Sequence, residues 1–295
     1  QCMGRVTWIV LSLGILSAWA CWHSASSVAV SMLVNVRPAR GANAAPPADI
    51  REVLTIPCPG ASVRAWVFEP RGTPRGTVVV LHGIGDSKLG SLNSARAHAA
   101  RGYRAVAWDS RGHGDSSGRF LTYGVQAAQD LRLLVDQLEQ RGLLAAPLAI
   151  VGSSYGAATA IQYGALDARV DRIVAISPFA SLREVVPAYL HWIAGRIALL
   201  VPAAWTDARI DEAGHIGGFD PDRACPRCVA PKLKAATLIV ASRADERIPF
   251  EQSQAVYAAL TARREWHLVD GAQHVSVGDA PGVQAAVVRW LDATH

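Results

Sequence analysis

The chain has 295 residues, of which 51% are hydrophobic and 18% charged. This composition allows one large domain with a sizeable buried core and excludes an intrinsically disordered chain. The formal net charge is +5, but the basic residues are almost all arginines spread singly along the chain. Because runs of like charge mark nucleic-acid and polybasic lipid binding, we expect no nucleic-acid partner.

The first 36 residues differ in composition from the rest of the chain. Arg5 is followed by an apolar stretch over residues 6–22, and a second apolar patch covers residues 28–36. This pattern is typical of an export signal or an N-terminal membrane anchor, and its length does not separate the two. We expect the segment to lie outside the folded domain, followed by a linker over residues 37–49. It would export the domain or attach it to a membrane, on the extracytoplasmic side in a bacterium.

From residue 50 to residue 295 the sequence predicts one α/β domain. Two β-rich runs, 53–56 and 63–68, are separated by a turn and predict an opening hairpin. Short apolar runs follow that are typical of strands covered on both faces of a parallel sheet: 78–81, 105–108, 148–151, 173–176, 238–241 and 266–269. Helical candidates alternate with these strands at 91–101, 125–140, 155–165, 250–262 and 281–291. The alternation predicts right-handed crossovers and a doubly wound, mostly parallel sheet.

An insertion over residues 181–222 interrupts this alternation. It carries an amphipathic, aromatic stretch over residues 185–201 and then a polar loop that contains glycine. In a doubly wound sheet, an excursion at this point lies over the carboxyl ends of the strands, where ligands bind. We expect a short helical lid or acyl-binding wall. The alternative is a surface helix pair without a role in the site, since apolar helical spacing is also ordinary core packing.

Cys225 and Cys228 have the C-x-x-C spacing of a redox pair, of half a metal site or of a local disulfide. The sequence offers no further pair of ligands for a tetrahedral zinc site, and the motif does not open a helix of a thioredoxin-like unit. For an exported domain we therefore expect a disulfide that closes a small loop. We expect Cys58 to be a free thiol in the core.

The sharpest motif is Gly152-Ser153-Ser154-Tyr155-Gly156, directly after one predicted strand and directly before a predicted helix. This is the G-x-S-x-G nucleophile elbow in its expected context. The tight turn holds Ser154 at the mouth of the sheet, at the amino terminus of the helix. Ser153 carries the neighbouring hydroxyl but occupies the wrong place in the motif.

A serine hydroxyl is a weak nucleophile unless a base removes its proton, so a histidine and an orienting carboxylate should follow Ser154 in the chain. Asp245 and His274 each follow a predicted strand, in loops at the edge of the sheet where Ser154 emerges. Asp270 and Asp279 are rival acids, but both are sequence neighbours of the histidine. The sequence therefore predicts a triad of Ser154, Asp245 and His274.

Acyl transfer also needs donors for the developing oxyanion. Glycines in the segment 81–85 would let the backbone N–H of Ile84 point inward beside that of Tyr155. We interpret His82 as a residue that braces this loop. The polar stretch 109–116 resembles a metal or acid–base cluster, but a glycine-rich turn whose side chains satisfy one another is the favoured interpretation.

Taken in order, these motifs resemble the α/β-hydrolase superfamily, and more narrowly its serine aminopeptidase-like and monoacylglycerol-lipase-like members. The resemblance covers about residues 50–295 and implies an α/β-hydrolase fold with an opening antiparallel hairpin and a short helical lid insertion. A serine at the elbow, rather than an aspartate, argues against dehalogenases and epoxide hydrolases. The N-terminal segment and the C-x-x-C pair lie outside the family pattern. By resemblance, the nucleophile is Ser154, the acid Asp245, the base His274, and the oxyanion donors Ile84 and Tyr155.

We expect a two-step acyl transfer that needs no cofactor, with a small-molecule or lipid-like acyl compound as substrate. Carboxylic ester hydrolysis is the first hypothesis, because no feature of the sequence suggests a site for the charged amino terminus of a peptide. A peptidase or a thioesterase of the same fold is the alternative enzyme. A non-catalytic binding protein is an alternative of another class, although the presence of all three triad residues speaks against it.

Overall fold

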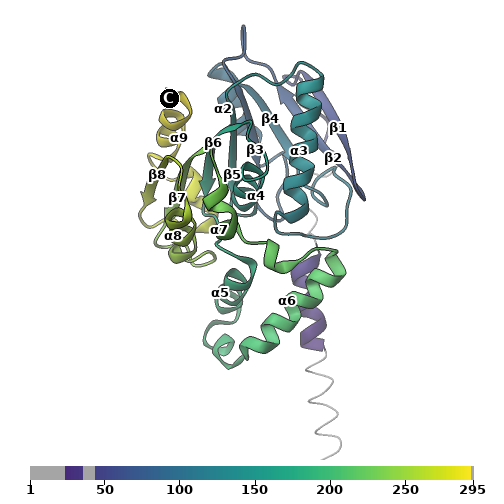
Figure 1. The fold of residues 1–295 in the computed structure, drawn as a ribbon, viewed down its shortest axis with the longest axis vertical. Coiled ribbons are helices and arrows are strands. Elements are labelled where there is room, and N and C mark those ends of the chain that lie inside the picture. The colour runs from purple at the N-terminus through teal and green to yellow at the C-terminus, as the bar shows by residue number, and fades with distance from the viewer. Residues whose placement is uncertain (1–23, 36–43, 294–295) are drawn as a thin grey trace, which may run out of the picture.

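The computed structural model describes residues 24–35 and 44–293, and its framework is one eight-stranded sheet (Figure 1). The strands are β1 (Glu52–Cys58), β2 (Ala61–Phe68), β3 (Thr77–Leu81), β4 (Arg104–Asp109), β5 (Leu148–Ser153), β6 (Val170–Ile176), β7 (Ala236–Ser242) and β8 (Arg264–Val269). Their spatial order is β1-β2-β4-β3-β5-β6-β7-β8. β1 and β2 form the predicted antiparallel hairpin, β2 pairs with β4 in antiparallel fashion, and the other neighbouring strands are parallel.

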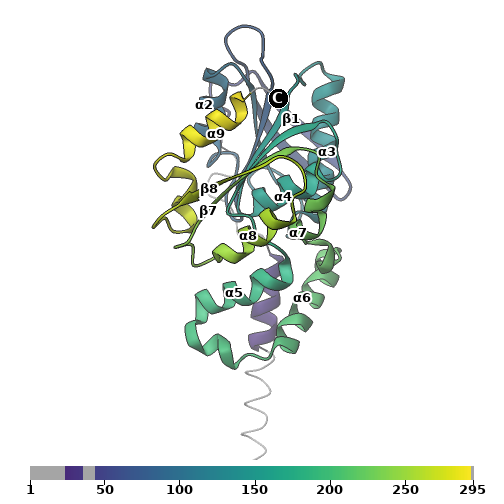
Figure 2. The ribbon, with the colours of Figure 1, turned by 60° about the vertical axis from the view of Figure 1, so that its left-hand side comes forward.

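Helices cover both faces of the sheet, so that it separates two hydrophobic cores (Figure 2). The helices after the first strand are α2 (Leu92–Ala100), α3 (Val125–Gln140), α4 (Tyr155–Gly164), α5 (Leu182–Ala194), α6 (Ala203–Gly217), α7 (Pro226–Val229), α8 (Phe250–Ala259) and α9 (Val283–Asp292). The larger core includes buried side chains of α3, α4 and α8, and the smaller one includes those of α2 and α9.

The burial of the central strands explains their sequence. Every residue of β3, β4 and β7 is buried, as expected for parallel strands with helices on both faces. The predicted strands and the five predicted helices are confirmed, with ends that differ by at most three residues. α3 has the bounds that its apolar period predicts.

The insertion after β6 is more helical than the sequence predicts. α5 and the 3₁₀ helix η1 (Gly195–Leu200) occupy the amphipathic stretch, but α6 replaces the predicted polar loop. Ile210 and Ala213 of α6 are buried. Gly214 of the same helix is closely approached by Pro221, whose Cγ would lie 2.5 Å from a Cβ at this position. Tertiary packing thus stabilises a helix that its polar, glycine-containing sequence does not indicate.

Residues 24–34 form a helix that lies beside α6 (Figures 1 and 2). Val30 and Val34 are buried against Ala213, which differs from the expectation that the N-terminal segment lies outside the domain. Residues 1–23, the core of the expected signal or anchor, and most of the expected linker lie outside the described residues. Within the described part of the chain, no helix combines the length and the apolar character needed to span a bilayer.

Candidate active site

The turn between β5 and α4 presents Ser154 in a constrained backbone conformation. Ser154 has φ 54° and ψ −114°, in the region that L-residues rarely adopt. A Cβ at Gly152 would lie 2.3 Å from the carbonyl oxygen of Gly156, and a Cβ at Gly156 would lie 2.5 Å from the carbonyl oxygen of Leu81. Both glycines are therefore required by close backbone contacts, as the elbow motif implies. The backbone N–H of Ser154 donates to the carbonyl of Ile176 at 2.7 Å and ties the turn to β6.

The structure brings the three residues of the predicted triad together. His274 Nε2 lies 2.9 Å from Ser154 Oγ, and His274 Nδ1 lies 2.7 Å from Asp245 Oδ2. Asp245 is buried, and its Oδ1 also accepts the backbone N–H groups of Arg247 at 3.1 Å and Ile248 at 2.9 Å. Because a carboxylate only accepts hydrogen bonds, this contact places the proton on Nδ1 and leaves Nε2 as the acceptor for the serine hydroxyl. The rival acids of the sequence analysis are not the partners of this histidine.

Three separate strand ends supply this arrangement. Ser154 follows β5, Asp245 follows β7, and His274 opens the 3₁₀ helix η4 (His274–Asp279) after β8. All three strands are parallel, so their carboxyl ends meet at one edge of the sheet. Three residues that are far apart in the sequence therefore contact one another because the sheet places these strand ends side by side.

The predicted oxyanion donors lie at the same place. Ile84 and Tyr155 line one cavity together with Ser154. Gly83 lies against the nucleophile, since a Cβ at that position would be 3.9 Å from the Cβ of Ser154. Tyr155 is the first residue of α4, where backbone N–H groups lie free of helical acceptors. The local arrangement is compatible with a carbonyl oxygen held between the loop after β3 and the start of α4.

A buried ion pair holds the loop after β3. Lys88 is 1% exposed, and its ammonium group pairs with Asp109 and with Asp115, the latter at 2.6 Å. Asp109 also accepts the backbone N–H groups of Lys88 at 2.7 Å and Asp115 at 2.8 Å. The ammonium group lies 4.7 Å from the ring centroid of Trp66. The interpretation of residues 109–116 as a turn whose polar groups satisfy one another is thus supported by these contacts.

Two buried histidines brace the same loops. His82 Nε2 accepts the backbone N–H of Ser110 at 3.0 Å, which confirms a bracing contact for His82. His113 packs between the rings of His82 and Tyr155, with centroids at 4.9 and 5.8 Å. Burial lowers the pKa of His113 to about 4, so this ring is neutral at physiological pH.

Above the triad lies a cavity of about 530 Å³ with a mainly apolar lining. The insertion lines it with Val185, Tyr189 and Trp192 from α5 and with Trp205 from α6. The insertion, predicted to form a short helical lid or an acyl-binding wall, thus lines the cavity over the carboxyl ends of the strands. Sequence reasoning missed a second wall, Ala29, Met32 and Leu33 of the N-terminal helix, although their i, i+3, i+4 spacing is that of one helix face.

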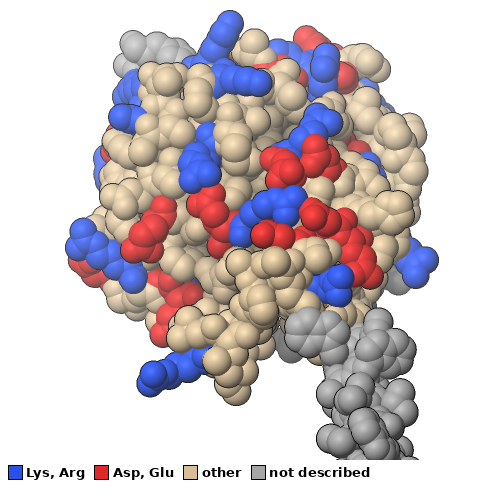
Figure 3. Space-filling model, turned by 60° about the horizontal axis from the view of Figure 1, so that its bottom comes forward, with Lys and Arg blue, Asp and Glu red and all other residues tan. Residues whose placement is uncertain are grey.

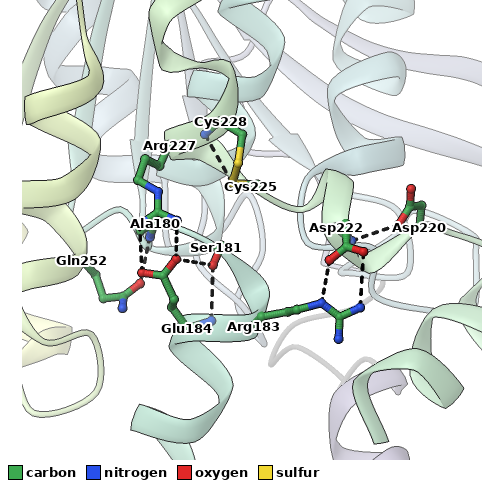
Figure 4. Close-up of a disulfide and its surroundings, with 10 residues drawn as sticks. All are labelled: Ala180, Ser181, Arg183, Glu184, Asp220, Asp222, Cys225, Arg227, Cys228 and Gln252. Atoms are coloured by element: carbon green, nitrogen blue, oxygen red, sulfur yellow. Dashed lines mark hydrogen bonds and ion pairs between the residues drawn. A yellow bond between two sulfur atoms is a disulfide. The ribbon is translucent and has the colours of Figure 1, made fainter. Parts of the chain in front are cut away.

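The two ends of the insertion are fastened close together at the sheet (Figure 4). Leu182 N–H donates to Ala224 O at 2.8 Å, and Arg227 N–H donates to Ala180 O at 3.0 Å. The Arg227 guanidinium also pairs with the carboxylate of Glu184 at 2.7 Å. These contacts hold the two ends of the lid together, and we call the paired residues 180–184 and 224–228 the neck of the lid.

Cys225, the residue directly before α7, and Cys228, within α7, form the predicted disulfide at this neck (Figure 4). Cys58 carries a free thiol, as predicted, but it is half-buried at the margin of the larger core rather than inside it. Burial is the main cause that raises the pKa of this thiol, to about 12, which makes it a poor nucleophile.

The surface around the lid carries mixed charge. Figure 3 shows acidic and basic side chains interspersed on this face rather than separated by sign. Among the ion pairs of the lid, Arg183 of α5 lies 2.7 Å from Asp211 of α6 and also pairs with Asp222. Such pairs link the lid helices to one another, although exposed ion pairs add little to stability.

Comparisons with known proteins agree with this architecture. The family model described as serine aminopeptidase, S33, matches residues 72–216. The uncharacterized protein YqkD of Bacillus subtilis (strain 168) is 25% identical over 219 residues, which are 73% of this chain and 70% of that protein. Among solved structures, the Pyrococcus furiosus esterase Pf2001 is similar with a TM-score of 0.68 and 21% identity, over 87% of this chain and 96% of that one. An alpha-beta serine hydrolase homologue from Coxiella burnetii has a TM-score of 0.56 and 19% identity, over 81% and 97% of the two chains.

The sequence match, the sheet topology and the elbow turn lead to one assignment. The chain has the α/β-hydrolase fold, and over residues 72–216 its sequence is similar to the serine aminopeptidase, S33, family.

Proposed function

We propose that this protein hydrolyses carboxylic esters with an apolar acyl group, through Ser154 as nucleophile, His274 as general base and Asp245 as the orienting acid. The observation that carries the proposal is the hydrogen-bonded chain of these three residues at the floor of an apolar cavity. The name of the similar Pyrococcus furiosus protein, an esterase, is consistent with this choice.

In the acylation step, Ser154 Oγ attacks the ester carbonyl carbon while His274 Nε2 takes the hydroxyl proton. Asp245 stabilises the imidazolium that forms, and the backbone N–H groups of Ile84 and Tyr155 hold the oxyanion. Collapse of the tetrahedral intermediate breaks the bond to the leaving alcohol, which receives the proton from His274. Water then attacks the acyl-enzyme with the same base and releases the carboxylic acid.

The cavity favours an apolar acyl group over a peptide. Its volume of about 530 Å³ lies in the range of small-molecule sites. Aromatic and aliphatic side chains of the lid form much of its wall, and burying a methylene group there contributes about 0.8 kcal/mol. A lipid-like or other small acyl ester would therefore gain binding energy from its chain, and the reaction needs no cofactor.

The test is labelling with a fluorophosphonate probe and peptide mass mapping, together with kinetics on p-nitrophenyl esters from acetate to dodecanoate. Ser154→Ala should abolish labelling and lower kcat by about 10⁴-fold or more. Ser153→Ala is the matched control, because it removes the adjacent hydroxyl and should keep both labelling and turnover. Labelling of Ser154 without turnover of any ester would reject ester hydrolysis, and thioester and peptide substrates in the same assay would then show which acyl bond is cleaved.

A further inference from the structure

The helix over residues 24–34 has two faces with different neighbours. Val30 and Val34 pack against Ala213 in a small apolar cluster. Ala29 and Met32, which lie on another side of the helix, line the cavity above Ser154. The segment thus contacts the domain with one face and the candidate active site with another.

Hydrogen bonds fix this helix in register with the wall of the cavity. The backbone N–H of Leu121 donates to the carbonyl of Val34 at 2.8 Å, and the Tyr123 hydroxyl donates to the carbonyl of Leu33 at 2.8 Å. Asn35 forms an isolated antiparallel bridge with Phe120. Leu121 and Tyr123 themselves line the cavity, so the helix is attached to the wall that it extends.

The lid provides further walls of the same space. Tyr189 and Trp192 of α5 and Trp205 of α6 line the cavity with the N-terminal helix, and α6 lies beside that helix (Figure 2). The nucleophile lies at the floor. An acyl chain that extends from Ser154 away from the sheet therefore passes between the lid and residues 24–34.

We propose that the helix over residues 24–34 is a specificity-determining wall of the active site, which binds the acyl chain of the substrate and sets its preferred length. This inference rests on the proposed function of Ser154. It assigns to a segment before the first strand a role that the composition of that segment does not indicate.

The test compares, in the full chain, substitutions at helix residues that line the cavity with a substitution at a helix residue that does not. Ala29→Trp adds bulk to the cavity wall, and Met32→Ala removes bulk from it. Val28→Trp is the matched control, because Val28 belongs to the same helix, is 58% exposed and does not line the cavity. Ala29→Trp should lower the ratio of kcat/KM for decanoate over acetate esters by about tenfold or more, since single methylene groups are worth that much in a fitted pocket. Met32→Ala should shift the preferred chain length, and Val28→Trp should leave the ratio unchanged.

Melting temperatures and fluorophosphonate labelling rates show whether each variant is folded. Folded variants whose chain-length profile equals that of the wild type would overturn the proposed wall. Calorimetric titration with decanoic acid tests the wall without catalysis, in the Ser154→Ala background. Weaker binding in Ala29→Trp but not in Val28→Trp would support the wall even if the wild type hydrolyses no ester. Equal binding in both variants would refute it, whatever the outcome for the proposed function.

Discussion

Replacement of Lys88 by methionine removes a buried cation and leaves the carboxylate of Asp109 without its ion-pair partner. Asp109 is fully buried and pairs with the ammonium group of Lys88, which also pairs with Asp115. The two backbone N–H groups that Asp109 accepts would remain. Removal of one partner from a buried ion pair costs about 3–5 kcal/mol of the free energy of unfolding, because it leaves an uncompensated charge. For a domain of this size that cost corresponds to a fall in the melting temperature of roughly 6–20 °C.

Differential scanning calorimetry of Lys88→Met and Arg96→Met tests this reasoning. Arg96 pairs with Asp49 at 2.7 Å, but both side chains of that pair are exposed. We expect Arg96→Met to leave the melting temperature almost unchanged, since solvent screens exposed pairs. If the two variants lowered the melting temperature equally, burial would not be the property that makes the Lys88 pair important, and the reasoning would be refuted.

Three further predictions concern pH, the disulfide and the elbow. Burial lowers the pKa of His98 to about 4, against an ordinary value of 6.5. The stability that this neutral, buried ring contributes is therefore fully present above pH 6.5 and is lost as the pH falls toward 4. His98→Phe should reduce the loss of unfolding free energy over that window by roughly 3 kcal/mol in urea titrations, whereas an equal loss in wild type and variant would reject the assignment. Replacement of both Cys225 and Cys228 by serine should cost no more than about 2 kcal/mol by calorimetry, because the closed loop is short; a much larger cost would mean that the disulfide organises the whole lid. Gly156→Ala should slow fluorophosphonate labelling at Ser154, because the new Cβ would meet backbone carbonyls, whereas Gly164→Ala in the same helix would meet the end of the flexible Ile173 side chain at 2.6 Å. Equal labelling rates in the two glycine variants would contradict that explanation.

The strands and the elbow could be predicted because local sequence determines them. Buried parallel strands need continuous apolar runs, and the short turn around Ser154 needs glycine where backbone atoms approach each other. The chain order of Ser154, Asp245 and His274 then indicated a triad whose geometry depends only on parallel strands ending at one edge. α3 has the bounds that its apolar period predicts, and its buried residues recur along the helix from Ala127 to Leu138.

The walls of the cavity could not be predicted in the same way. α6 has a polar, glycine-containing sequence, and Pro221 and Phe219 pack closely against two of its glycines. Residues 24–34 share their apolar composition with the rest of the N-terminal segment, so composition indicated a leader rather than a wall. In both cases the decisive contacts join segments far apart in the chain, which no local pattern describes.

The neck of the lid has a consequence for how this protein can change over evolution. Because residues 180–182 and 224–227 are hydrogen-bonded to each other, the chain leaves the sheet after β6 and returns toward β7 at nearly the same point. Everything between these residues can lengthen, shorten or be exchanged without a change in the spacing of the two strands, since loop length adds only slowly to the entropic cost of closure. Descendants of this chain could therefore acquire new substrates by replacing the segment above the neck, while the catalytic floor keeps its geometry.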